Sequence, residues 1–488
     1  MRLTARALYD WYQPSECALR VWLKARGEAE AEPSEYQKIL HELGRRHELR
    51  HLATLGESVD LSKGTLDERV HLTVEAMQAG QRVLYQPVLV APHAFDGVEC
   101  ELMGIPDVCI RQNDGNVIRD CKISRHADEE LHYETILQLG FYGFLYERTV
   151  GKAPLRLEVL LGDGTLQEVP YDGGIAALSH LERVFRTVRQ PVEFYEPVGW
   201  SKCNGCGYYG RCWKKAEGTD DVARVYGVDQ AIARVLHEQG IENVTELLAN
   251  LDETSLGEIS VPRGSRVHRV GKKATEIFAH AHALSSKELR LISKPALPLG
   301  ENFAFFDIEG LPPQVDELEK IYLWGIQVFG KEPSEYFVAF ANFGEDGDRQ
   351  GWLDFLQNCK RSFERYGNLP ILHWTPYERT YLHKYIKRHG DLEGIAGRVD
   401  RNLVDLFPIV KDCVVLPSPT YGLKAVEEYT GFTRKLNEAD GQWAMATYIK
   451  AVETEDTEER DKLKKQIIEY NKEDLAGAWA AFEWLRGL

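Results

Sequence analysis

Two extended stretches between residues 104 and 124, joined by turn residues at 113–116, restrict the possible folds of this chain more than any other feature. The sequence reads GIPDVCIRQNDGNVIRDCKIS, with Asp107 before the first stretch and Asp120 and Lys122 near the end of the second. Because side chains alternate between the two faces of a strand, Asp120 and Lys122 point to the same side and Cys121 points away. A β-hairpin can bring Asp107 beside that pair, so the sequence predicts two carboxylates and an ammonium group close together.

This combination suits the metal-assisted hydrolysis of phosphodiester bonds. The carboxylates would hold Mg²⁺ or Mn²⁺, the metal would activate a water molecule, and the ammonium would orient that water or stabilise developing charge. An isolated D-x-K pattern is better explained as a surface hairpin with ordinary charges. Neighbouring motifs are therefore needed to distinguish a metal site from such a hairpin.

Residues 1–218 show the pattern of an α/β domain with a mixed sheet flanked by helices. Strands are predicted at 83–92, 100–112, 116–124 and 155–162, and helices at 129–148 and 177–189. Upstream, GRRHE places His47 on a helix, and QLGFY places Gln138 and Tyr142 on one face of the helix after the hairpin.

In this order, G-x-x-H, P-D-x12-D-x-K and Q-x3-Y resemble the PD-(D/E)XK nuclease superfamily, specifically its RecB-like branch. The resemblance implies a restriction-endonuclease-like sheet and a Mg²⁺ or Mn²⁺ site. The implied metal ligands are His47, Asp107, Asp120 and the Cys121 carbonyl, the implied catalytic lysine is Lys122, and the implied active-site or DNA-positioning groups are Gln138 and Tyr142.

Three clustered cysteines, Cys203, Cys206 and Cys212, follow this domain with the spacing C-x2-C-x5-C. In a reducing compartment such spacing favours metal or cluster ligation over disulfides, although buried packing cysteines are an alternative. Local spacing favours zinc but cannot separate Zn²⁺ from an iron-sulfur cluster. Iron-sulfur RecB-like nucleases, including CRISPR-associated ones, have one further cysteine before the nuclease core. That resemblance implies a [4Fe-4S] cluster whose fourth ligand is Cys17.

Residues 298–488 form a second predicted α/β domain, in which Asp307 and Glu309 share one face of a strand. Downstream, Tyr470 and Asp474 lie one helical turn apart. This set resembles the RNase H-like DEDD exonucleases of the Y-x3-D type, which implies two metal ions, a general-base role for Tyr470 and digestion from 3′ to 5′. Where that family commonly has N-x4-D, this sequence has His373 and Glu378, and Asp405 is another acidic candidate.

The middle segment, residues 219–297, has little strand signal and is predicted to form short helices. It resembles helix-hairpin-helix modules of DNA-repair proteins, and a plain helical linker fits equally well.

The composition limits where nucleic acid can bind. A net charge of −17 argues against a generally basic surface, so contacts are expected in grooves, with residues 360–388 as one local basic stretch. The sequence contains no apolar run that could span a membrane and begins without a secretory signal, which predicts a soluble, cytoplasmic protein.

The whole chain resembles a bacterial family of RecB-like nucleases that joins an iron-sulfur PD-(D/E)XK domain to an RNase H-like domain. It is therefore predicted to be a multidomain α/β, metal-dependent DNA nuclease with two active sites, acting on single-stranded or end-bearing DNA in repair, recombination or defence. Because the sequence lacks a Walker A motif, unwinding would need a separate helicase. The alternatives are an RNA-processing nuclease and a non-catalytic iron-sulfur scaffold that binds DNA ends.

Overall fold

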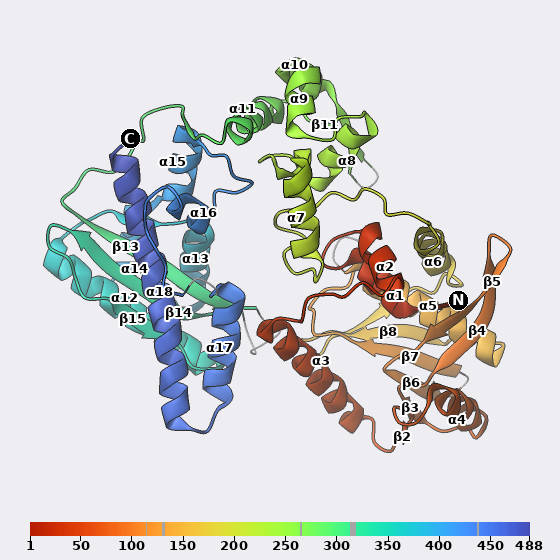
Figure 1. Cartoon of the computed structure of the whole chain (residues 1–488). Coiled ribbons are helices and arrows are strands. Elements are labelled where there is room, and N and C mark those ends of the chain that lie inside the picture. Colours follow the sequence, from red (N-terminus) through yellow and green to blue (C-terminus); the bar gives the residue numbers. More distant parts are fainter. Residues whose placement is uncertain (114, 129–131, 264–265, 313–318, 437–438) are drawn as a thin grey trace. The chain divides into compact units, whose positions relative to one another are not determined.

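A computed structural model describes residues 1–488 except 114, 129–131, 264–265, 313–318 and 437–438 (Figure 1). One residue of the predicted turn and the first residues of the predicted helix 129–148 thus lie outside the described residues. The chain divides into two compact units. The first contains Met1–Pro33, Gln37–Glu196 and Ser201–Arg211, and the second contains Ser34–Tyr36, Pro197–Trp200 and Cys212–Leu488.

The first unit is built on a six-stranded mixed sheet. Its strand order is β2 (Val59–Asp60), β3 (Val83–Tyr85), β6 (Val108–Gln112), β7 (Gly115–Cys121), β8 (Arg156–Leu160) and β9 (Leu166–Val169). Strand β7 pairs antiparallel with β6 and parallel with β8. The predicted hairpin is therefore present, and its second strand lies inside the sheet.

A smaller sheet in this unit has the order β1 (Arg2–Thr4), β5 (Val98–Gly104) and β4 (Leu89–Phe95). It accounts for two differences from the sequence prediction, because the predicted strands 83–92 and 100–112 are each divided between the two sheets. The first break lies at Gln86, whose φ of 49° is incompatible with continuous strand. The second follows Gly104, at Pro106.

Helix α5 (Tyr133–Val150) forms the centre of the first unit's core. It is buried on nearly all sides because it packs against both sheets and against two other helices, α1 (Ala5–Tyr12) and α6 (Ile175–Val188). The remaining helices are α2 (Ala18–Ala25), α3 (Glu35–Thr54), which lies almost wholly in this unit, and α4 (Leu66–Gln78).

The second unit begins with a small, mostly helical part. Its elements are α7 (Tyr209–Thr219, beginning in the first unit), the 3₁₀ helix η1 (Val222–Arg224), α8 (Gln230–Glu238), α9 (Val244–Asn250), α10 (Glu253–Glu258), β10 (Ser260–Arg263), β11 (Arg266–Arg269) and α11 (Lys273–Ser286). Side-chain caps at Asp229, Asn243 and Asp252 start three of these helices. The antiparallel pair β10 and β11 was not expected from the sequence, which predicted helices here.

The rest of the second unit is a five-stranded sheet covered by helices on both faces. The strand order is β15 (Phe337–Phe340), β14 (Lys320–Gly330), β13 (Asn302–Leu311), β16 (Ile371–His373) and β17 (Leu403–Asp405), and a short pair joins β12 (Arg290–Leu291) to β18 (Val414–Val415). The helices are α12 (Gly344–Tyr366), α13 (Tyr377–His389), α14 (Ile395–Asn402), α15 (Leu406–Cys413), α16 (Leu423–Glu427), α17 (Gly441–Glu453) and α18 (Thr457–Arg486).

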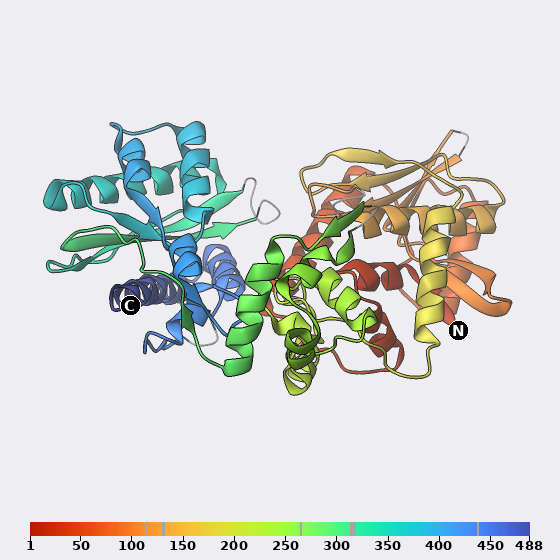
Figure 2. The same cartoon turned by 90° about the horizontal axis from the view of Figure 1, so that it is seen from above.

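Alternation along β13 explains why this sheet is covered on both faces. Ala304, Phe306 and Ile308 pack in the core that contains α12, whereas Phe303 and Phe305 pack in the core that contains α18. Figure 2 shows helices on both sides of this sheet, with the C-terminal helix on one of them. Asp307 and Glu309 continue the face of Phe303 and Phe305, so the alternation directs them toward α18.

None of the helices in the described part of the chain is both long enough and apolar enough to cross a membrane.

Candidate active sites

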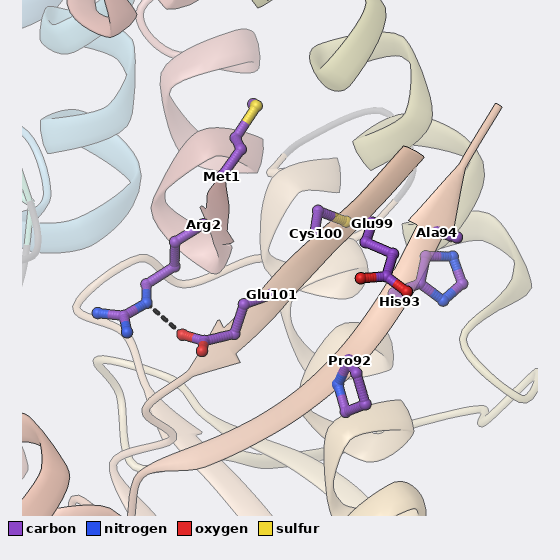
Figure 3. Close-up of a pocket in the computed structure, with 8 residues that line it drawn as sticks. All are labelled: Met1, Arg2, Pro92, His93, Ala94, Glu99, Cys100 and Glu101. Carbon is purple, nitrogen blue, oxygen red and sulfur yellow. Dashed lines mark hydrogen bonds and ion pairs between the residues drawn. The ribbon is translucent and has the colours of Figure 1, made fainter. Parts of the chain in front are cut away.

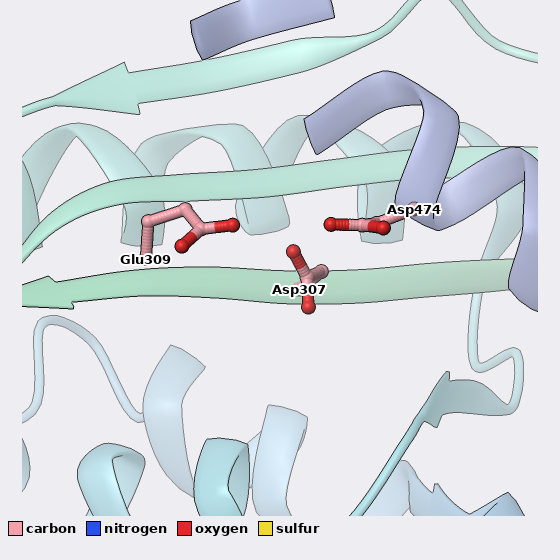
Figure 4. A group of neighbouring side chains, drawn as sticks. All are labelled: Asp307, Glu309 and Asp474. Atoms are coloured by element: carbon pink, nitrogen blue, oxygen red, sulfur yellow. The ribbon is translucent and has the colours of Figure 1, made fainter. Parts of the chain in front are cut away.

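Three carboxylates from two elements meet in the second unit. Asp307 and Glu309 come from β13, and Asp474 comes from α18 (Figure 4). One carboxylate oxygen from each lies within 4.8 Å of the others, and among the described residues no other set of three histidine, cysteine or carboxylate side chains meets this criterion. Such a set of hard oxygen ligands suits Mg²⁺ or Mn²⁺.

The electrostatics of this group favour a bound cation. Burial, followed by the charges of Asp474 and Glu309, raises the pKa of Asp307 well above its ordinary value. Burial, followed by the charges of Asp474 and Glu378, does the same for Glu309. Both pKa values are raised because these carboxylates are buried and lie close to other negative charges. A divalent ion bound there would supply the missing positive charge.

The other predicted members of this site lie nearby. Tyr470 is 6% exposed, and burial followed by the charges of Asp474 and Glu309 raises its pKa. Glu378 is buried beside His373, whose Nδ1 lies 3.3 Å from the Glu378 carboxylate and 2.7 Å from the Thr375 carbonyl oxygen. The buried Nε2 of His373 has no hydrogen-bond partner among the described residues.

Asp405 has a structural role at the edge of this group. Its Oδ1 accepts hydrogen bonds of 3.0 Å from the backbone amides of Thr375 and Phe407. The residue faces His373 in the pairing of β16 and β17, and its charge contributes to the raised pKa of Glu378.

Two further residues hold the predicted ligands, and sequence reasoning missed both. The Nδ2 of Asn471 donates to Asp307 at 2.5 Å, and the Tyr336 hydroxyl donates to the Asn471 Oδ1 at 2.8 Å. Asn471 directly follows Tyr470 in the sequence, and this adjacency was the only available signal.

The second missed residue is Arg434, which connects Asp474 to a buried glutamate. Its guanidinium donates to Asp474 at 2.5 Å and to both oxygens of Glu427 at 2.6 and 2.7 Å. Glu427 lies against α18 at Gly477, where a Cβ atom would meet a Glu427 carboxylate oxygen at 1.9 Å. No sequence spacing predicts the contacts among Glu427, Arg434 and Asp474, because the three residues come from separate segments.

The first unit brings together the residues of the predicted hairpin. Lys122 Nζ lies 2.6 Å from Asp120, which is 2% exposed. The backbone amide of Cys121 donates to Asp107 Oδ2 at 2.7 Å. Asp107 therefore lies beside the end of β7, where the sequence predicted it.

His47 and the Gln138–Tyr142 pair lie around this group. The Nε2 of His47 is 3.4 Å from the Leu160 carbonyl oxygen, which also accepts from the backbone amide of Lys122. Gln138 donates to the Tyr142 hydroxyl at 2.9 Å, and both lie on the face of α5 predicted from their spacing.

Glu48 is a further acidic group in this region, and sequence reasoning did not select it although it follows His47 directly. Burial, then the charges of Asp120 and Glu48, raises the pKa of Asp107 well above its ordinary value. Burial lowers the pKa of Lys122, but the charges of Asp120 and Asp107 outweigh it and raise the pKa overall. Lys122 is thus held as an ammonium group among carboxylates.

Three cysteines of the first unit, Cys17, Cys203 and Cys206, also lie close to one another. Burial, then the Glu196 charge, raises the pKa of Cys17 to about 12, and Cys203 and Cys206 lie close enough to add to this shift. The amide of Cys206 donates to the Cys203 carbonyl at 2.8 Å, which forms a tight turn. Cys212 lies on α7. All nine cysteines are described, and none is joined in a disulfide.

A cavity of about 660 Å³ lies apart from both groups (Figure 3). Strands β4 and β5 and the first two residues line it, and Arg2 forms an ion pair with Glu101 at its edge. No member of either carboxylate group lines this cavity.

The fold and sites define a protein with two nuclease-like α/β domains, and comparisons with known proteins agree. Residues 6–213 match the model of the PD-(D/E)XK nuclease superfamily, and residues 304–486 match that of the RNase H superfamily. The chain thus carries these two domains in this order, and the predicted fold class is confirmed. Such nuclease domains generally use divalent metal ions such as Mg²⁺ or Mn²⁺.

Two other comparisons add little. A solved structure titled "Crystal structure of SSO0001" aligns at 16% identity over 36% of this chain and 97% of that chain. Its TM-score is 0.21, too low to support a structural argument. No curated protein gives a significant match.

Proposed function

We propose that the protein is a metal-dependent DNA nuclease that hydrolyses phosphodiester bonds at two active sites. The proposed domains are a RecB-like PD-(D/E)XK nuclease with an iron-sulfur cluster at 1–218, a helical, helix-hairpin-helix-like linker at 219–297 and an RNase H-like exonuclease of the DEDD type at 298–488. The observation that carries the proposal is the convergence of Asp307, Glu309 and Asp474 within 4.8 Å inside a matched RNase H superfamily domain.

In the second site, the proposed metal ligands are Asp307, Glu309, Glu378 and Asp474. A divalent ion bound there would lower the pKa of water and neutralise charge on the scissile phosphate. Tyr470 lies beside Asp474 and Glu309, which suits it to orient the attacking water. Asn471 fixes the Asp307 carboxylate, and Arg434 fixes that of Asp474.

In the first site, Asp107 and Asp120, with His47 and the Cys121 carbonyl, are the proposed ligands. Lys122 remains charged among them, so its ammonium can stabilise negative charge on the phosphate or orient the attacking water. Gln138 and Tyr142, joined by a hydrogen bond, are the proposed positioning groups for the strand.

We assign a [4Fe-4S] cluster, with Zn²⁺ as the alternative, to Cys17, Cys203, Cys206 and Cys212. The proximity of Cys17, Cys203 and Cys206, seen in their mutual effects on the thiol pKa values, supports a shared metal or cluster. Its proposed ligands come from both ends of the nuclease domain's sequence, so the cluster would tie the beginning of that domain to its end.

DNA with single strands or free ends is the proposed substrate, in repair, recombination or defence alongside a separate helicase. The test is digestion of end-labelled single- and double-stranded DNA, with RNA of the same sequence, by anaerobically purified protein supplied with Mg²⁺ or Mn²⁺. Wild type, Lys122→Ala, Asp307→Asn and the double variant are compared. Each single variant should retain one activity, and the double variant should retain none.

Three results would change this assignment. Equal digestion by all four proteins would show that neither site is correctly placed. Preference for RNA would make the protein an RNA-processing nuclease. Tight binding of DNA ends without cleavage by wild type would identify a scaffold.

A further inference from the structure

The paired strands β10 and β11 and the start of α11 carry a concentration of positive charge that is unusual for this acidic chain. Residues 260–275 contain five lysines and arginines, one histidine and no acidic residue, although the whole chain has a net charge of −17. All five of these cationic side chains are exposed. They are Arg263, Arg266, Arg269, Lys272 and Lys273.

The fold places two of these like charges opposite each other. Arg263 lies directly opposite Arg266 in the β10–β11 pairing, an arrangement that destabilises an antiparallel pair. Asp229 offsets part of this charge through a 2.5 Å ion pair with Arg263. Arg263, Arg269 and Lys273, together with His268, line one cavity of about 260 Å³.

The start of α11 adds to the positive potential. Lys272 occupies the N-cap without a side-chain cap, and Lys273 is the first residue of this 14-residue helix. The positive end of a helix dipole favours acidic residues, so two lysines there are unfavourable unless an anion binds. Glu276, the acidic residue in the first turn, forms an ion pair of 2.9 Å with Lys411.

The same helix joins this surface to the part of the unit that contains Asp307. In the middle of α11, His280 is buried, with Nδ1 3.1 Å from the Leu416 carbonyl and Nε2 3.1 Å from the Tyr421 hydroxyl. A 14-residue helix is about 21 Å long. The basic surface is therefore fixed to the RNase H-like part within one helix length.

We propose that this surface, defined as Arg263, Arg266, Arg269, Lys272 and Lys273, binds the sugar–phosphate backbone of the nucleic acid that the protein cleaves. Its charge complements a phosphate chain, and Val267, which follows Arg266 in β11 and is 67% exposed, offers an apolar contact for a sugar or base. The inference rests on the proposed nuclease function and adds to it a binding surface outside both active sites.

The test measures binding without cleavage, by fluorescence anisotropy of labelled single-stranded DNA and RNA with EDTA at several KCl concentrations. The variants are Arg266→Gln/Arg269→Gln and Lys272→Gln/Lys273→Gln. The control, Lys287→Gln/Lys294→Gln, removes two exposed lysines elsewhere in the same unit. At 0.1 M salt, losing two phosphate contacts should weaken binding about 10- to 30-fold and reduce the salt slope by about 1.4.

The control should bind as wild type does, and Arg266→Lys/Arg269→Lys should keep most of the affinity because it keeps the charge. Wild-type affinity in both glutamine variants would overturn the inference, as would equal weakening in the control. If those variants bind normally while wild type cleaves DNA, only this inference fails. If wild type neither binds nor cleaves DNA or RNA, the proposed function fails as well. Tighter RNA binding with the same variant effects would support the surface and identify RNA as its ligand.

Discussion

The two candidate active sites hold their carboxylates in different ways. In the second unit, three carboxylates converge from a strand and a helix, and Asn471 and Arg434 hold two of them from outside. In the first unit, Asp107 and Asp120 come from one hairpin, and Lys122 is paired directly with Asp120. The second site is therefore organised before a metal binds, with Arg434 reaching Asp474 from outside the group, whereas in the first site the cation, Lys122, is itself a member of the group.

This difference predicts unequal metal affinity, and Asp307→Asn should have the largest effect. Loss of a ligand from a preorganised set should weaken Mn²⁺ binding at the second site by about 100-fold or more. Asp120→Asn should reduce only the weaker Mn²⁺ binding at the first site, because Lys122 already offsets the charge of Asp120. Isothermal titration with Mn²⁺ on both variants and wild type measures this. A first site that binds Mn²⁺ more tightly than the second would reverse the comparison.

Gly477→Ala tests whether the surroundings of the second site are as rigid as the contacts imply. The added methyl would overlap the Glu427 carboxylate and disturb its buried pair with Arg434. Breaking a buried pair costs about 3–5 kcal/mol, so we expect a clear loss of stability and of second-site cleavage, with first-site cleavage kept.

Gly218 provides the matched control for that substitution. It also lies in a helix, α7, but a Cβ there would meet nothing within 4 Å. Gly218→Ala should be neutral or stabilise the protein by up to about 1 kcal/mol, measured by denaturant unfolding. Similar losses in both variants would mean that the Glu427 contact is unimportant.

In the first site, Glu48→Gln should have a moderate effect. Glu48 accepts a 3.0 Å hydrogen bond from Gln86, and its negative charge helps to raise the pKa of Asp107. A neighbour that tunes a ligand typically changes metal affinity by about 10-fold to 100-fold, and we expect the lower value here because Lys122 compensates. Titration with Mn²⁺ in an Asp307→Asn background isolates this site. Unchanged affinity would leave Glu48 without a role there.

Cys17→Ser tests the cluster assignment by iron, sulfide and zinc content and by visible absorbance after anaerobic purification. Loss of a thiolate ligand should reduce the iron content and the stability of the first unit, while second-site cleavage continues. Cys100→Ser, in β5 outside the proposed ligand set, serves as the control. Zinc in wild type would select the alternative metal, and unchanged iron in Cys17→Ser would remove Cys17 from the set.

How much the sequence could predict depended on the range of each interaction. Strand alternation placed Asp120 beside Lys122, and helical periodicity placed Tyr470 one turn from Asp474, because both patterns are local. Arg434 escaped prediction because its partners come from other segments.

Local conformation caused the remaining differences. The predicted strand 83–92 is divided because Gln86 adopts a φ of 49°, which no hydrophobic pattern reveals. Strands β10 and β11 form in a segment with little strand signal, where Val261 supplies one buried apolar contact. Short strands stabilised by tertiary packing are the elements that sequence patterns predict least well.

The smallest predicted effect concerns pH and compares a half-buried histidine of the first unit, His51, with a buried histidine of the second, His280. Burial, then the Arg119 charge, lowers the pKa of His51 in the first unit, and burial lowers that of His280 in the second. A histidine with a lowered folded-state pKa stays neutral on folding, whereas in the unfolded chain it binds a proton below about pH 6.5. Each therefore contributes a loss of stability as the pH falls below that value.

Replacing either histidine by glutamine should reduce the fall in Tm between pH 7.5 and 5.5. His280 should show the larger change because its ring is more deeply buried and both ring nitrogens are engaged by Leu416 and Tyr421. A contribution near 1 kcal/mol corresponds to about 2–4 °C in a domain of this size. His282→Gln, at an exposed position of the same helix, should leave the pH dependence unchanged. An unaltered pH dependence in His280→Gln would show that protonation of this histidine does not oppose folding, and the second unit would then owe its acid sensitivity to other groups.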